Sequence, residues 1–136
     1  MKTTLNFTSD TCHLAEVRST LRHMLEDSGM DEMEAELLVL AVDEACANII
    51  RHAYANMPGQ PVLIEMEKTD ASLRITMRDH GKPCDPENLH GRALDDFRPG
   101  GLGVHIIRKV FDEVVYQPGK RGTELLLVKQ FAPPLS

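Results

Sequence analysis

Apolar side chains recur along the first half of the chain at the spacing of a helix face. They lie three or four residues apart in two stretches, 11–27 and 31–50, which predicts two amphipathic helices. Asp31 and Glu34 form a capping-box pattern at the start of the second helix. Residues 5–7 alternate between apolar and polar, so a short strand is expected before the first helix.

The second half of the chain is dominated by the alternation that is typical of strands. Two alternating segments, 61–68 and 73–78, flank a short turn and predict a hairpin. A helix is expected at 102–111, followed by strands at 114–116 and 123–131. Helices grouped with hairpin-connected strands are typical of the α+β class. The expected architecture is a two-layer α/β sandwich with a mixed, mainly antiparallel sheet.

The length and composition of the chain predict a single acidic domain. The 136 residues suffice for a single core and contain no linker, so 1–136 is expected to be one domain with a disordered tail at 132–136. The net charge of −6 argues against general affinity for nucleic acid or anionic membranes. No signal peptide or membrane-spanning apolar run stands out, and the three cysteines form no C-x-x-C pair. A cytoplasmic location is therefore expected.

Glu44 and Asn48 form the first candidate functional pair. Four residues apart on a helix, they share one face. An amide oxygen suits Mg²⁺, and a carboxylate can orient and deprotonate an attacking hydroxyl. The same spacing also describes an ordinary solvated helix face. The surrounding apolar residues favour a functional interpretation, because they predict a largely buried helix in which polar groups need partners.

Asp79 comes directly after the second strand of the hairpin. Its carboxylate is placed to accept a hydrogen bond from an exocyclic amine such as that of adenine, and Gly81 allows a ring to approach the backbone. An Asp-x-Gly turn at the end of a strand is the alternative interpretation, and it needs no ligand. Thr123 begins the last strand, where its hydroxyl is placed to contact adenine, or Asp79 through a water. It is also an ordinary residue for a strand.

A run of glycines, Gly100-Gly101-Leu102-Gly103, precedes the third predicted helix. The first N–H groups of a helix have no partner within it, so such a start suits a phosphate. The run fits neither a dinucleotide-binding nor a P-loop pattern. A flexible loop that leads into a helix is the alternative. Arg98 adjoins the glycines and is the basic side chain best placed to neutralise phosphate charge.

In this order, the four motifs resemble the N box and the G1, G2 and G3 boxes of the GHKL, or Bergerat, ATP-binding fold. The resemblance covers residues 5–128 and is greatest to the small anti-sigma-factor serine/threonine kinases. Their N box reads Glu-Ala-x-x-Asn followed by a His and an aromatic residue, as in residues 44–54 here. The chain departs from the family pattern at Pro83, which replaces a small residue and removes one N–H.

The resemblance implies a role for each matching residue. It implies ATP and Mg²⁺ as cofactors, Glu44 as the catalytic base, Asn48 as the metal ligand and residues 84–99 as a short ATP lid. The residues that it implies for ATP binding are Asn48, Asp79, Gly81, Arg98, Gly100, Gly101, Leu102, Gly103 and Thr123.

The same resemblance implies a function and a set of partners. The expected protein is a serine/threonine kinase that phosphorylates a STAS-type antagonist and sequesters a sigma factor, with a homodimer as a further expectation. Arg18 occupies the place of a basic residue that contacts partners, although a solvated helix arginine is an equal alternative. The alternative function is a nucleotide-binding module that sequesters a partner without significant kinase activity. A plain GHKL ATPase or chaperone fragment is disfavoured, since no second domain is expected.

Overall fold

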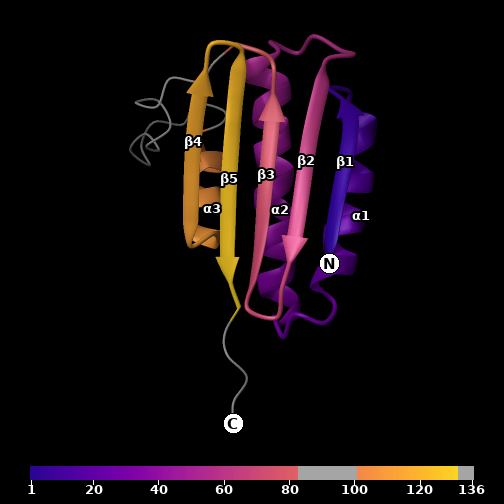
Figure 1. Ribbon diagram of the computed structural model, residues 1–136, viewed down its shortest axis with the longest axis vertical. Helices are drawn as coiled ribbons and strands as arrows, with labels where there is room; N and C mark the ends of the chain where they lie inside the picture. Colours follow the sequence, from indigo (N-terminus) through magenta and orange to yellow (C-terminus); the bar gives the residue numbers. More distant parts are fainter. Residues whose placement is uncertain (83–100, 132–136) are drawn as a thin grey trace.

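A five-stranded sheet covered on one face by helices forms the protein (Figure 1). The computed structural model describes residues 1–82 and 101–131, and in 101–105 only the backbone. The strand order is β1-β2-β3-β5-β4. The elements are β1 (Lys2–Thr8), a 3-10 turn (Thr11–His13), α1 (Leu14–Leu25), α2 (Glu32–Asn48), a π-helical turn η2 (Ile49–Ala53), β2 (Pro61–Lys68), β3 (Ser72–Asp79), α3 (Gly101–Val110), β4 (Glu113–Gly119) and β5 (Gly122–Gln130).

The predicted two-layer α/β sandwich is confirmed. All four pairings in the described sheet are antiparallel, so the parallel pairing that a mixed sheet would contain is not found among the described strands. Two strands are longer than predicted. β1 pairs with β2 from Lys2 to Thr8, and β4 pairs with β5 from Glu113 to Gly119. Ladder hydrogen bonds thus extend strand structure into polar ends that show no alternation.

The core lies between the sheet and the helices. In β2 and β3 every second side chain is buried, which places one face of the sheet against the helix layer. Helix α2 packs against both α1 and α3 and is therefore the central helix of that layer. The fully buried side chains include Leu21, Leu38, Ile64, Met77 and Leu127.

The ends of α2 explain how it is held in place. The carboxylate Oδ1 of Asp31 accepts a hydrogen bond from the Glu34 N–H at 2.7 Å, so the Asp31 half of the predicted capping box is confirmed. At the other end the helix continues into the π-helical turn η2. Ala55 and Asn56 then take positive φ angles of 49° and 63°, and this left-handed pair reverses the chain toward β2. Turns of the π type are frequent at functional sites.

Along the described residues, no helix combines the length and apolar character that a membrane crossing requires.

Candidate functional site

Glu44 and Asn48 lie near the C-terminal end of α2, where both side chains are half-buried. The helix around them is buried as predicted, but the two polar side chains themselves stay partly exposed. Their apolar neighbours Ala45 and Cys46 point into the core, whereas the Glu44 side chain keeps 30% of its surface exposed. An accessible carboxylate beside an accessible amide oxygen is better suited to meet a ligand than a pair sealed in the core.

Arg51 joins the two predicted site residues. Its Nη2 lies 3.1 Å from the Asn48 Oδ1 and 3.4 Å from the Glu44 Oε2. Its Nε is buried and has no hydrogen-bond partner among the described residues. A guanidinium therefore occupies the space between the amide and the carboxylate, and a cation bound at Asn48 has to share or replace this contact.

Arg51 is a site residue that was not predicted from the sequence. The histidine after it, His52, was the residue that the family pattern emphasised, and it is exposed. Arg51 lies in the π-helical turn, whose wider backbone departs from the 3.6-residue period on which face assignments rest. The sequence did contain one signal for it. A basic residue follows Asn48 by three positions, and residues at that spacing are neighbours on a helix surface.

Asp79 is a buried carboxylate at the end of β3, with only 4% of the residue exposed. Its Oδ1 accepts a hydrogen bond from the Gly81 N–H at 3.0 Å. Burial raises the pKa of Asp79, and hydrogen bonds from the backbone N–H groups of Gly81 and Thr123 oppose that rise. Thr123 thus contacts the carboxylate through its backbone, while the predicted contact of its hydroxyl with a ligand stays a prediction.

Two glycines let the backbone close around Asp79. A Cβ added at Gly81 would lie 2.3 Å from the Ala53 carbonyl oxygen, and one added at Gly122 would lie 1.9 Å from the Asp79 carbonyl oxygen. Both distances are far inside van der Waals contact. Gly81 is therefore required by its approach to the end of η2, whereas the predicted approach of an adenine ring stays a prediction.

Tyr54 connects the helix that carries Glu44 and Asn48 to the turn after Asp79. Its buried hydroxyl donates a hydrogen bond to the Pro61 carbonyl at 2.5 Å and accepts one from the His80 N–H at 2.7 Å. The Lys82 N–H also donates to the Ala53 carbonyl at 2.7 Å. The turn after Asp79 is therefore anchored to the end of the helix that carries Glu44 and Asn48.

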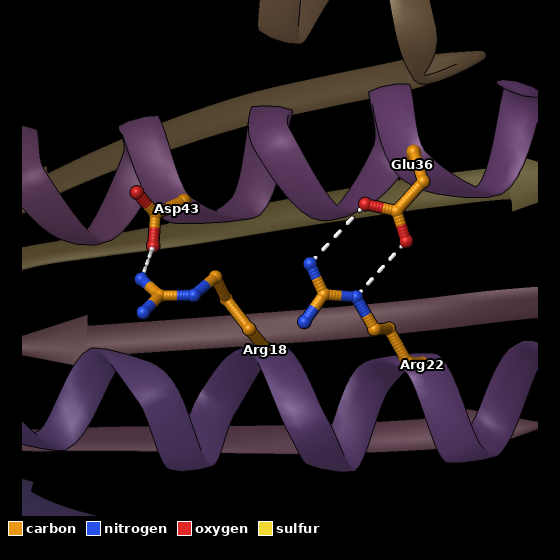
Figure 2. A network of polar contacts seen from close by, with 4 residues as sticks. All are labelled: Arg18, Arg22, Glu36 and Asp43. Carbon is orange, nitrogen blue, oxygen red and sulfur yellow. Dashed lines mark hydrogen bonds and ion pairs between the residues drawn. The ribbon is translucent and has the colours of Figure 1, made fainter.

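The remaining predicted residues divide into three groups. Gly101, Leu102 and Gly103 form the first turn of α3, as expected for a helix that begins in glycines. Arg98, Gly100 and the predicted lid at 84–99 lie outside the described residues. Arg18 projects from α1 toward α2, where its Nη1 lies 2.7 Å from the Asp43 Oδ1 (Figure 2). This ion pair engages Asp43, the carboxylate next to Glu44.

The chemistry of these groups fits ATP and Mg²⁺. The Asn48 amide oxygen is a neutral ligand of the kind that Mg²⁺ accepts alongside phosphate oxygens and water. Arg51 supplies a positive charge in an acidic chain, and its buried Nε is a donor without a protein partner among the described residues. Asp79 offers carboxylate oxygens in a buried setting, where a hydrogen bond with an amine is strong.

Comparisons with known proteins identify a family and named relatives for this chain. A family model described as a histidine kinase-like ATPase domain matches residues 7–129. The serine/threonine-protein kinase BtrW of Bordetella bronchiseptica is 32% identical over an alignment of 102 positions, and the match covers 71% of this chain and 70% of BtrW. The serine-protein kinase RsbW of Bacillus subtilis is 28% identical over 109 residues, or 74% of this chain and 68% of RsbW.

A likeness to solved structures supports the fold. The structure of the RsbU and RsbW domains of Rv1364c from Mycobacterium tuberculosis matches with a TM-score of 0.70 at 18% identity. The match covers 98% of this chain and 33% of that longer chain. This match shows a shared fold. The function has to be argued from the site residues.

Proposed function

Since the chain belongs to the histidine kinase-like ATPase domain family, alongside serine/threonine-protein kinases such as BtrW, we propose that it phosphorylates a STAS-type antagonist and sequesters a sigma factor. The observation that carries the proposal is the grouping of Glu44, Asn48 and Arg51 at one helix end, anchored through Tyr54 to the turn after Asp79. This grouping combines a proton acceptor, a metal ligand and a buried acceptor for an amine.

Each residue has a distinct task in the proposed reaction. When bound, ATP supplies the phosphoryl group and Mg²⁺ neutralises charge on its oxygens. Asn48 would hold the metal through its Oδ1, sharing or replacing the contact with Arg51, and Asp79 would accept a hydrogen bond from the adenine amine. Glu44 orients the serine or threonine hydroxyl of the antagonist and accepts its proton. Arg51 adds positive charge beside both groups, so it offsets the repulsion between Glu44 and the incoming phosphates.

Replacing Asp79 by Asn should weaken ATP binding while the protein still folds. The amide presents a donor where the adenine amine needs an acceptor, and losing a hydrogen bond to a charged group costs roughly 1.5–3 kcal/mol. Folding should survive, because the amide oxygen can still accept the hydrogen bond from the Gly81 N–H, and burial, which raises the pKa of Asp79, does not penalise a neutral side chain. Calorimetric titration with ATP measures the effect. An unchanged ATP affinity in the folded variant would remove adenine recognition from Asp79.

Replacing Asn48 by Ala should reduce ATP affinity strongly in the presence of Mg²⁺ and only weakly in chelator. The amide oxygen acts on the nucleotide only through the metal in this proposal. The two conditions are compared by nucleotide titration of the same protein preparation. Equal losses with and without Mg²⁺ would mean that Asn48 supports Arg51 or the helix and not the metal.

The experiment that tests the function as a whole is phosphoryl transfer to a partner. The purified chain is incubated with labelled ATP, Mg²⁺ and a STAS-type protein from the same organism. Label is expected on a serine or threonine of that protein, and chelator should abolish it. ATP binding without transfer to any STAS-type protein would instead favour a module that sequesters its partner without kinase activity.

A further inference from the structure

An exposed apolar ridge runs along the outer face of α2. Met33, Leu37 and Leu40 expose 75%, 46% and 44% of their surface, respectively. Within the described residues only two other large apolar side chains, Met1 and Met57, are classed as exposed. Because the three ridge residues are four and three positions apart, they lie on one side of the helix. The opposite side carries buried residues that face the sheet.

The ridge leads directly to Glu44. Glu44 follows Leu40 by four residues, so it continues the same row one turn further on. From Met33 to Glu44 the row extends about 16 Å at the helical rise per residue. A hydroxyl that is deprotonated by Glu44 has to reach this end of the row. The protein that carries the hydroxyl must therefore cover the helix surface beside it.

Ion pairs neutralise the charges along the part of the ridge nearest Glu44, from position 36 onward. On the side toward α1, Arg18 pairs with Asp43 at 2.7 Å and Arg22 pairs with Glu36 at 2.9 Å (Figure 2). At the end of the ridge, Glu44 pairs with Arg51 at 3.4 Å.

Every charged residue from position 36 to position 51 therefore has an opposite partner, although the chain as a whole carries a net charge of −6. The surface beside Glu44 is apolar at its centre and electrically balanced at its edge. An apolar partner surface suits it better than a strongly charged one.

We propose that the ridge formed by Met33, Leu37 and Leu40 docks the phosphoacceptor protein. The partner surface is an apolar patch next to its serine or threonine hydroxyl, and docking along the ridge delivers that hydroxyl to Glu44. Arg18 lies at the edge of this surface, where it can contact the same partner. The inference rests on the proposed kinase function and adds the surface that selects the substrate protein.

Polar substitutions on the ridge provide the test. The variants Leu37→Ser and Leu40→Ser, singly and together, are compared with the wild-type chain in calorimetric binding of the STAS-type protein. The double variant should bind at least tenfold more weakly, because a few desolvated residues near the centre of an interface carry most of its affinity. In transfer assays its KM for the STAS-type protein should rise in the same proportion, with kcat at saturation and ATP affinity unchanged.

Met57→Ser is the matched control, since Met57 is an exposed methionine outside the ridge. It should leave both binding and KM unchanged. Wild-type affinity in the double ridge variant would overturn the proposal. It would also be overturned if light scattering showed a wild-type dimer that the ridge substitutions dissociate, since a second copy of the chain would then cover the ridge.

The binding measurement separates this inference from the kinase proposal. If the wild-type chain binds the STAS-type protein but transfers no phosphate, the proposed kinase function is wrong. The affinities of the ridge variants for that protein still test the docking proposal. If the wild-type chain does not bind that protein at all, the docking proposal is overturned.

Discussion

Replacing Glu44 by Gln is expected to lower the rate of phosphoryl transfer by about 10²–10⁴. The amide keeps the size of the side chain and can still contact Arg51, but it cannot accept a proton from the attacking hydroxyl. ATP affinity should change little, because the carboxylate serves the attacking group and not the bound nucleotide. Binding of the proposed sigma-factor partner should also survive, since that depends on surface complementarity. Single-turnover transfer measures the rate, and calorimetry measures the ATP affinity.

Asp43→Asn is the matched control for this prediction. Asp43 is the adjacent carboxylate on the same helix, but it is engaged by Arg18 at 2.7 Å. Its removal breaks a partly exposed ion pair, which typically contributes less than about 1 kcal/mol. Turnover at saturating partner concentration should therefore stay near the wild-type value. A Glu44→Gln protein that transfers phosphate at the wild-type rate would end the assignment of Glu44 as the base.

Replacing Gly122 by Ala is expected to destabilise the fold by roughly 2–6 kcal/mol. Gly122 has a φ of +100°, a conformation that costs a residue with a side chain about 1–3 kcal/mol. The new Cβ would also lie 1.9 Å from the Asp79 carbonyl oxygen. Relieving that clash by a backbone shift adds about 1–3 kcal/mol. Urea denaturation measures the loss in the free energy of unfolding.

Gly119 offers a control in the same hairpin. It pairs with Gly122 in the sheet, but its φ is not positive, and a Cβ there would meet its nearest heavy atom only at 3.9 Å. Gly119→Ala should thus be tolerated. The shift that relieves the clash at Gly122 moves Asp79, so a surviving Gly122→Ala protein should also bind ATP less tightly. Equal stability of the two variants would show that the close approach to Asp79 is relieved at little cost.

The layers of the fold could be predicted because apolar periodicity reflects burial. The alternation in residues 61–68 and the capping pattern at Asp31 correspond directly to β2 and to the start of α2. The full lengths of β1 and β4 could not be predicted, since their polar ends are held by hydrogen bonds to neighbouring strands. Such pairing depends on which strands become neighbours, and local sequence does not contain that information.

The candidate site was predictable where its residues are close in sequence. The spacing of Glu44 and Asn48 placed them on one helix face, and the structure confirms that neighbourhood. Three other contacts were beyond sequence reasoning. Arg51 depends on a π-helical turn, Tyr54 reaches His80 across 26 residues, and Arg18 reaches Asp43 across 25. The contacts of Tyr54 and Arg18 result from packing between elements, whereas Arg51 contacts Asn48 three residues away within one helical stretch. The predicted roles of Arg98 and Gly100 in ATP binding stay predictions.

Transfer of labelled phosphate from ATP to a STAS-type protein from the same organism, measured for the wild-type chain and for Glu44→Gln in parallel, tests the central claim most directly. The account predicts label on a serine or threonine of the STAS-type protein, dependent on Mg²⁺ and almost abolished by the substitution, while both proteins bind ATP with similar affinity. A wild-type chain that binds ATP and the STAS-type protein but transfers no phosphate would contradict it.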